Sequence, residues 1–192
     1  EHDYRRALHL LQRDHNNGLS GYELGNLYQF GRGVKIDREA SQRYYKKALQ
    51  IFQKVYKESD DNEFLKSYLP YRIGKQYFYG QGAERDYSKA RLYFEDAAKK
   101  GNQYAAYHLG KLYASEQNEH YDLGKAVKYL KQSDLKRNKY AQYTLSKLYL
   151  AEDQNRTEGL KLLERSADAG FVPAQYKLGR IYTDGQAEEF NF

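Results

Sequence analysis

The chain has no cysteine, no methionine and no tryptophan among its 192 residues. Without cysteine it can form no disulfide bond, no thiolate metal site and no cysteine nucleophile. This composition fits a reducing compartment, so we expect a cytoplasmic location. No apolar run approaches the roughly 18–20 residues that span a membrane, and no signal-peptide pattern opens the chain, so we expect no membrane insertion. The absent initiator methionine predicts a processed chain or a piece of a longer protein.

Tyrosine, by contrast, is abundant. It occurs 22 times, in a chain whose mean hydropathy of -1.02 is very low for a compact globule. Because tyrosine buries its ring and leaves its hydroxyl in water, this choice suits thin, half-buried layers. The formal charge is +6, and residues 65–192 carry most of it, with 21 basic and 16 acidic side chains. Such a surplus of positive charge favours acidic partners only mildly. The chain lacks the dense basic patch that a dedicated nucleic-acid binder usually has.

One phrase of seven residues recurs five times around a central glycine or serine. The copies are "YELGNLY" from Tyr22, "YRIGKQY" from Tyr71, "YHLGKLY" from Tyr107, "YTLSKLY" from Tyr143 and "YKLGRIY" from Tyr176. Their central positions are spaced by 49, 36, 36 and 33 residues. A second pattern follows every copy but the last and begins at Asp37, Asp86, Asp122 or Arg156. Periods of this length indicate a solenoid.

Both patterns predict helices, because their apolar residues recur at helical spacing. The stripe of the third copy is Ala105, Leu109, Leu112 and Tyr113. The expected N-caps of the second helices are Asp37, Asp86 and Asp122. The expected left-handed C-caps are Gly101, Gly170 and, less favourably, Asn138. A glycine inside a helix costs about 1 kcal/mol against alanine, and we expect it to permit close helix crossing, with Gly110 near Ala126.

The two ends of the chain repeat parts of the same pattern. "DYRRALHLLQRDHNNG" aligns without a gap on "DYSKARLYFEDAAKKG", so residues 1–18 are predicted to be the second helix of an incomplete repeat. The expected division of a single solenoid is 1–18, 19–64, 65–101, 102–138, 139–170 and 171–192. Because no terminal capping repeat is visible, we expect a fragment of a longer protein.

A helix with "A-x-Y-x-L-G-x-L-Y", a loop with "G-x-G-V", a helix start "D-x-x-x-A" and a period near 36 resemble Sel1-like repeats, which are relatives of tetratricopeptide repeats. The resemblance covers nearly the whole chain, is strongest at residues 23–49 and 72–101, and weakens at 114–126 and 151–163. It implies an all-α fold, a right-handed α/α solenoid of helical hairpins whose first helices form a concave surface. It also implies protein–protein adaptor work rather than catalysis.

Two glycine-rich loops, "GRG" at Gly31–Gly33 and "GQG" at Gly80–Gly82, could be mistaken for phosphate-binding loops. No strand pattern precedes them and no "GK[ST]" follows, so turns between helices are expected. The five histidines form no HExxH motif, and no serine lies in a nucleophile elbow. We therefore expect no catalytic residue, no metal site and no cofactor, and we do not expect an enzyme.

One helical face carries tyrosines and cations. It comprises the positions six before, two before and one after the central glycine, which are i, i+4 and i+7 neighbours. Its members are Tyr68, Arg72 and Lys75, then Tyr104, His108 and Lys111, then Tyr140, Thr144 and Lys147, then Pro173, Lys177 and Arg180. The first copy breaks the rule with Leu19, Glu23 and Asn26. Since the apolar stripe must point into the stack, this face points elsewhere, and the family resemblance implies the concave groove.

Two interpretations of this face stay open. As a solvated surface, its cations only keep the helices soluble and its tyrosines pack between repeats. As a ligand groove, aromatic rings beside cations suit an acidic peptide or a single-stranded nucleic acid. We favour a protein or peptide, because the surplus charge is modest. The expected function is therefore a non-catalytic scaffold for protein–protein interaction.

Two other functions remain compatible with the sequence. Tyrosine- and lysine-rich Sel1-like arrays without cysteine resemble those that follow the nicking domain in some conjugative relaxases of Gram-positive bacteria. The chain would then be an accessory region that docks such an enzyme or helps it hold DNA. A regulator of a secretion or envelope protein is the other alternative.

The first two copies are separated by 13 more residues than the usual 36. The extra stretch, "QIFQKVYKESDDNEFLKSYLP", prolongs the second helix of its repeat. Its apolar stripe continues through Ile51, Phe52, Val55 and Tyr56. Phe64, Leu65 and Tyr68 of the next helix are expected to pack against this stripe. The pattern predicts a longer helical hairpin that projects from the solenoid. This hairpin either packs against a neighbouring domain or is a family-specific embellishment.

Overall fold

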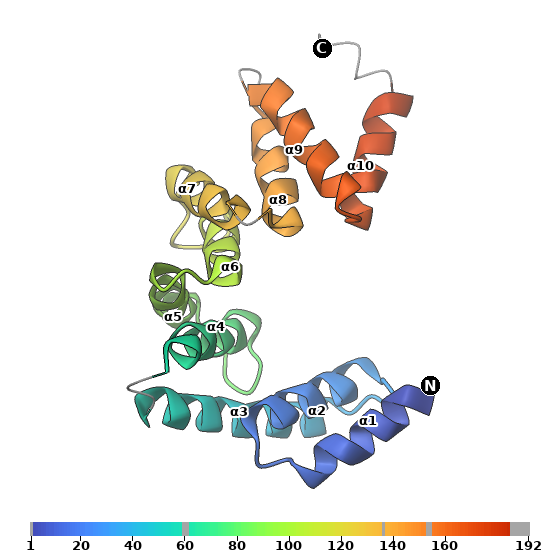
Figure 1. Ribbon diagram of the computed structural model, residues 1–192, viewed down its shortest axis with the longest axis vertical. Coiled ribbons are helices and arrows are strands. Elements are labelled where there is room, and N and C mark those ends of the chain that lie inside the picture. The colour runs from blue at the N-terminus through green and yellow to red at the C-terminus, as the bar shows by residue number, and fades with distance from the viewer. Residues whose placement is uncertain (1, 59–61, 136, 153–154, 185–192) are drawn as a thin grey trace. The chain divides into compact units, whose positions relative to one another are not determined.

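The computed structural model describes residues 2–58, 62–135, 137–152 and 155–184, and within these ranges it contains helices and no strand (Figure 1). The helices are α1 (His2–Arg13), α2 (Gly18–Phe30), α3 (Arg38–Glu58), α4 (Glu63–Tyr79), α5 (Tyr87–Lys99), α6 (Gln103–Tyr113), α7 (Leu123–Asp134), α8 (Lys139–Tyr149), α9 (Arg156–Asp168) and α10 (Val172–Thr183). The predicted all-α fold is confirmed. None of these helices is long and apolar enough to cross a membrane.

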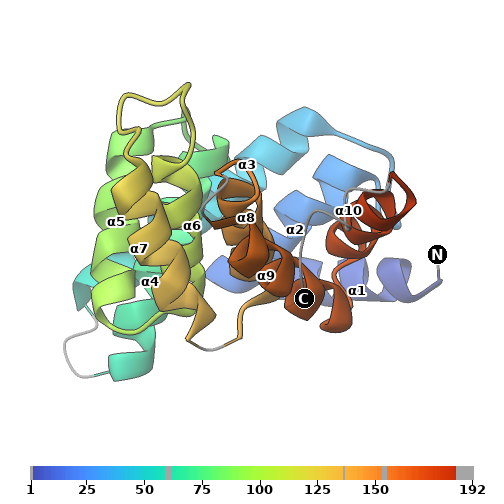
Figure 2. The same cartoon turned by 90° about the horizontal axis from the view of Figure 1, so that it is seen from above.

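The helices belong to two compact units, unit 1 (residues 1–102) with α1 to α5 and unit 2 (residues 103–192) with α6 to α10. In unit 1, α2 packs against α3 and α4 against α5, and α1 lies against α2. In unit 2, α6 packs against α7, α8 against α9 and α9 against α10, and the last two pairs can be followed in Figure 2. Each first helix therefore pairs with the second helix of its own repeat.

The starts of the second helices are fixed by aspartate side chains. Oδ1 of Asp37, Asp86 and Asp122 accepts a hydrogen bond from the backbone amide three residues further on, at 2.8, 2.8 and 2.9 Å. Each bond satisfies one amide that has no partner within its helix, an interaction that typically stabilises a helix by about 1 kcal/mol. The predicted N-caps are confirmed.

In α2, α4 and α6, a glycine of the first helix lies against a large side chain of its partner helix. A Cβ atom placed on the glycine would come within 2.5–2.7 Å of that side chain. The pairs are Gly25 with Tyr45, Gly74 with Phe94 and Gly110 with Leu130. The predicted close crossing is thus present. Leu130, one turn beyond Ala126, occupies the space that the missing side chain leaves.

Two of the three predicted C-caps are confirmed. Gly101 and Gly170 follow α5 and α9 with φ of 80° and 74°, the left-handed region that glycine adopts without strain. The prediction for Asn138 was wrong. Its side-chain oxygen caps the start of α8 by accepting from two backbone amides, at 3.0 and 3.3 Å, and Arg137 takes the left-handed conformation instead, with φ of 54°.

Residues 1–18 form a shorter helix than predicted. The helix α1 ends at Arg13, and Gly18 already belongs to α2. The side chain of Asn17 accepts a hydrogen bond from the amide of Leu19 at 2.9 Å and so starts the next helix. The alignment did not show this, because Asn17 aligns with Lys100, which follows the end of α5, whereas Asn17 caps the start of α2.

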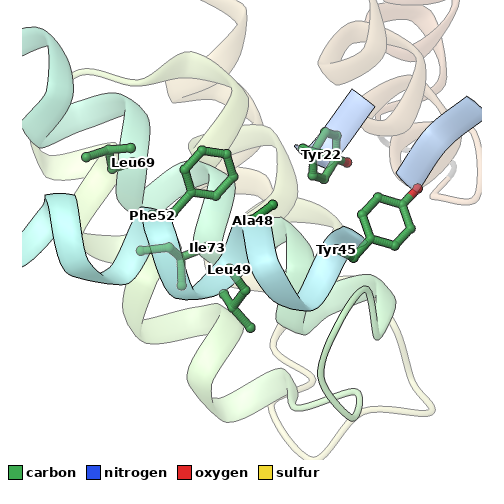
Figure 3. Close-up of a cluster of buried hydrophobic side chains, with 7 residues drawn as sticks. All are labelled: Tyr22, Tyr45, Ala48, Leu49, Phe52, Leu69 and Ile73. Atoms are coloured by element: carbon green, nitrogen blue, oxygen red, sulfur yellow. The ribbon is translucent and has the colours of Figure 1, made fainter. Parts of the chain in front are cut away.

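The long helices α3 and α4 contribute most of the core of unit 1, a role that the sequence did not predict. Its buried side chains come from α2, α3 and α4 (Figure 3), and they are Tyr22, Tyr45, Ala48, Leu49, Phe52, Leu69 and Ile73. Leu65 and Tyr68 of α4 pack against this cluster, as do Val55 and Tyr56 of α3. Phe64 does not, since it is 67% exposed and stacks on Tyr68. Part of the predicted extension, residues 59–61, lies outside the described residues.

Candidate functional site

The predicted cation–tyrosine face of unit 1 lies along α4. Tyr68 and Arg72 are one turn apart, and Nε of Arg72 donates a hydrogen bond to the hydroxyl of Tyr68 at 2.7 Å. The guanidinium carbon of Arg72 lies 5.0 Å from the ring centres of both Tyr68 and Tyr22. Arg72 is therefore held between a ring of its own helix and a ring of α2.

Lys75 approaches the same tyrosine. Its Nζ lies 5.5 Å from the ring centre of Tyr22 and 6.0 Å from that of Tyr71. Contacts of this kind stabilise a cation by about 0.5–2 kcal/mol. Burial nevertheless lowers the pKa of Lys75, and the charge of Arg72 lowers it further, while Glu23 acts in the opposite direction. The loss of water around the charged form of Lys75 thus has a larger effect on its pKa than the opposing effect of Glu23.

These side chains line a hollow of about 450 Å³ between α2, α4 and the loop after α4, which we call the Tyr22 hollow. Its lining residues are Tyr22, Glu23, Asn26, Gln29, Phe30, Arg32, Arg72, Lys75, Tyr79 and Gln81. Three of them are cations and one is a carboxylate. Within the described part of the chain, no carboxylate comes within 4.0 Å of Arg32, Arg72 or Lys75. The hollow therefore presents positive charge that the protein leaves unpaired there.

Hydrogen bonds fix the floor of the Tyr22 hollow. The hydroxyl of Tyr22 donates to Oε1 of Gln81 at 3.0 Å, and burial raises the pKa of Tyr22 to about 12, so this donor stays protonated at neutral pH. The hydroxyl of Tyr45 lies 2.6 Å from both Oδ1 of Asn26 and Oε1 of Gln29, and it donates its single proton to one of them. These hydrogen bonds thus hold the ring of Tyr22, which faces the cations, in place.

The wall of the hollow opposite α4 was missed in the sequence. Glu23 and Asn26 belong to the first copy, which we took as an exception to the pattern, yet they line the hollow together with Tyr22. Asn26 donates to Oε2 of Glu23 at 3.0 Å. The available signal was the repeat itself, because stacked repeats place the first helix of one copy beside that of the next.

In unit 2 the predicted residues of α6 have different surroundings from one another. Tyr104 is 47% exposed, but His108 is only 6% exposed, and Nδ1 of His108 lies 2.8 Å from the backbone oxygen of Tyr104. Our expectation that this face points away from the stack was therefore wrong for His108. Lys111 lies 5.7 Å from the ring centre of Tyr107, and burial lowers its pKa.

The remaining predicted residues of unit 2 lie on α8 and α10. The ring of Tyr140 lies 5.9 Å from that of Tyr107 and 5.2 Å from that of Phe171. Lys147 is exposed and Lys177 is half-buried. The guanidinium of Arg180 pairs with Asp184 at 3.1 Å. Rings meet on this face, but Arg180 already has a carboxylate, in contrast to Arg72 and Lys75 in unit 1.

Unit 2 also has a hollow, and the charges of its lining are balanced. It measures about 650 Å³ and is lined by Asp134, Leu135, Arg137, Gln142, Arg165, Asp168 and Ala169. Two arginines face two aspartates there, so its lining gives no preference for an acidic ligand. The Tyr22 hollow, lined by three cations and one carboxylate, has the more one-sided charge.

The repeats identify the family of the chain. The family model described as Sel1 repeat matches residues 1–13, 22–50, 71–102, 103–133, 139–171 and 172–189. The chain belongs to the Sel1 repeat family, as its sequence pattern predicted. Proteins of this family are helical solenoids that generally serve as non-catalytic scaffolds for protein–protein interaction.

Two solved structures have a similar fold. A Sel1 repeat protein from Oxalobacter formigenes aligns with a TM-score of 0.62 and 25% identity, over 94% of this chain and 71% of that protein. The protein c5321, a protective antigen of uropathogenic Escherichia coli strains with an SLR fold, aligns with a TM-score of 0.58 and 20% identity. That alignment covers 94% of this chain and 45% of c5321, so the chain spans less than half the length of that protein. A comparison with curated proteins found no match.

Proposed function

We propose that this Sel1 repeat chain is a scaffold that binds an acidic segment of a partner protein, with the Tyr22 hollow as its anchoring site. The observation that carries the proposal is the convergence of Arg72 and Lys75 on one tyrosine ring, with no described carboxylate within 4.0 Å. A partly dehydrated cation without an anion is costly. A ligand carboxylate would supply the missing charge and would restore the ordinary pKa of Lys75.

The polar lining of the hollow supports a carboxylate as the bound group. The side-chain amides of Asn26, Gln29 and Gln81 are beside the cations, and amide and guanidinium groups both donate to carboxylate oxygens. In unit 2, we propose Tyr104, Lys111, Tyr140, Lys147, Lys177 and Arg180 as a contact surface of its own for a partner protein, and buried His108 lies against the backbone oxygen of Tyr104. The resemblance to arrays of conjugative relaxases, the role in secretion or the envelope, and the cytoplasmic location stay predictions.

The test uses short blocked peptides of glycine and serine with one central glutamate or one central glutamine, each labelled for fluorescence anisotropy. We expect the glutamate peptide to bind the protein more tightly than the glutamine peptide. We expect Lys75→Gln to weaken the glutamate peptide by about tenfold or more, the loss of a charge-assisted hydrogen bond. The matched control is Lys57→Gln, which removes one exposed lysine from the last turn of α3.

Three results would contradict the proposal. They are equal binding of the two peptides, an unchanged affinity in Lys75→Gln, and an equal loss in Lys57→Gln. Binding of a labelled oligothymidine is measured in the same way and tests the nucleic-acid alternative. Tight binding of oligothymidine with a steep dependence on salt, without binding of the glutamate peptide, would assign the cations to phosphates instead.

A further inference from the structure

A second hollow of unit 1 adjoins the Tyr22 hollow. We call it the loop hollow, and it measures about 460 Å³. It is lined by Tyr4, Arg5, Gly31, Arg32, Gly33, Val34 and Lys35. Arg32 lines both hollows, so the two share a wall. Three cations and no carboxylate line the loop hollow, which makes its charge more one-sided than that of the Tyr22 hollow.

Arg32 is held at the boundary by two rings. Its guanidinium carbon lies 5.2 Å from the ring centre of Phe30 and 6.0 Å from that of Tyr4. A guanidinium over an aromatic ring can still donate hydrogen bonds from its N–H groups. Within the described residues Arg32 has no carboxylate within 4.0 Å. It can therefore donate to an anion in either hollow.

The loop itself offers a backbone donor. Gly33 and Gly82 occupy equivalent places in the first two repeats, and both have positive φ, 73° and 76°. The amide of Gly82 donates to the side-chain oxygen Oε1 of Gln42 at 2.7 Å. The amide of Gly33 has no acceptor among the described residues. The second repeat thus shows how an oxygen is bound at this loop, and the first repeat leaves the same donor available to a ligand.

The loop hollow is also firmly built. A Cβ on Gly33 would lie 2.8 Å from the backbone and the Cβ of Tyr4, so α1 packs directly on the loop. Backbone amides of such a loop, combined with cations, form a concave anion site. Arg5 and Lys35, both exposed, are further cations of its lining.

From these observations we infer that one acidic segment occupies both hollows and must carry two carboxylates. The first carboxylate lies at Arg72 and Lys75 in the Tyr22 hollow. The second lies at the amide of Gly33, between Arg5 and Lys35, and the backbone of the segment passes Arg32. This inference rests on the proposed function and adds to it a requirement for a second acidic residue. Two linked contacts bind far more tightly than one, because the second contact becomes intramolecular.

The test compares the one-glutamate peptide with two-glutamate peptides. The two glutamates are separated by between about 2 and 6 glycine or serine residues, since each extended residue spans roughly 3.3 Å. We expect one spacing to bind about tenfold or more tightly than the one-glutamate peptide. We expect the double variant Arg5→Gln/Lys35→Gln to remove this gain and to leave the one-glutamate peptide unaffected. Lys54→Gln/Lys57→Gln is the control, because it removes two exposed charges of α3.

The failures of the two proposals are distinguishable. If no glutamate peptide binds, the proposed function fails, and this inference fails with it. If the one-glutamate peptide binds and no two-glutamate peptide binds more tightly, only the inference fails. It also fails if the gain survives in Arg5→Gln/Lys35→Gln, or if Lys54→Gln/Lys57→Gln removes it equally. Circular dichroism of each variant checks that the helices are intact.

Discussion

Tyr22 is the residue on which the proposed site is centred. Its ring faces two cations, and its hydroxyl donates to Gln81 at 3.0 Å. The ring and the hydroxyl can be separated by mutation. Tyr22→Phe keeps the ring and leaves one amide oxygen without its donor, which we expect to lower the free energy of unfolding by about 1 kcal/mol.

We expect Tyr22→Phe to change the affinity for the one-glutamate peptide by less than about threefold, because cation–ring contacts survive. Tyr22→Leu removes the ring, and we expect it to weaken the peptide by about tenfold. Urea unfolding and anisotropy measure the two effects. Equal affinities of Tyr22→Phe and Tyr22→Leu would show that the ring does not organise the cations.

Lys75 should give peptide binding an unusual dependence on pH. Its pKa is lowered from the usual 10.5, chiefly by burial and then by Arg72. As the pH rises through this lowered pKa, Lys75 loses its charge, and the affinity for an acidic peptide falls. The decline should therefore begin at a lower pH than for an ordinary lysine, while Tyr22, with a pKa of about 12, stays neutral. A carboxylate in the hollow opposes the loss of the proton and raises the pKa of Lys75.

This dependence is measured by titrating the glutamate peptide between about pH 7 and pH 11 at constant ionic strength. Lys75→Gln is the control, and its profile should lack the decline. A profile that is the same in both proteins would contradict the role of Lys75.

The sequence predicted part of this site and missed the rest for a physical reason. Tyr68, Arg72 and Lys75 share a helical face through their spacing alone, so the pattern identified them. Tyr22 and Glu23 come from another repeat, and only the packing of α2 beside α4 shows their role. The burial of His108 was equally beyond the pattern, because it depends on how neighbouring elements cover α6.

At the scale of helices, the recurring glycine has two different surroundings. Gly110 of α6 faces Leu130. For Gly179 of α10, at the same place in its repeat, an added Cβ would meet no atom within 4 Å among the described residues, its own helix backbone aside. Alanine favours a helix over glycine by about 1 kcal/mol, and overpacking a core costs about 1–3 kcal/mol. We therefore expect Gly179→Ala to raise the free energy of unfolding by up to about 1 kcal/mol, and Gly110→Ala to lower it.

Urea unfolding of the two variants decides the matter, since each is the control for the other. Leu130→Ala should cost less in the Gly110→Ala protein than alone, because the new methyl group fills part of the space that it opens. A stabilised Gly110→Ala would mean that close packing does not require the glycine.

Helix boundaries were predictable where a side chain forms a hydrogen bond with the backbone a few residues away. Asp37, Asp86 and Asp122 cap the helices that follow them, because the capping bond spans only three residues. The prediction failed at Asn138, where two local roles compete. An asparagine can end one helix or begin the next, and here the start of α8 prevails and leaves the left-handed conformation to Arg137.

At the scale of the whole chain, both hollows lie in unit 1. Every lining residue of the two hollows falls between Tyr4 and Gln81, and the core of this unit comes from its own helices. A unit with its own core is expected to fold alone. We predict that residues 1–102 are helical by circular dichroism and bind the two-glutamate peptide within about threefold of the full chain. Residues 103–192 should bind it weakly, and an unfolded or inactive 1–102 fragment would contradict this prediction.

A double-mutant cycle tests most directly whether Lys75 holds a ligand carboxylate. It combines Lys75→Gln in the protein with glutamate to glutamine in the one-glutamate peptide, and anisotropy gives the four affinities. We expect a coupling free energy of at least about 1 kcal/mol, since residues in contact are not additive. A coupling indistinguishable from zero, with both single changes additive, would show that the carboxylate binds elsewhere and that the Tyr22 hollow is not the anchoring site.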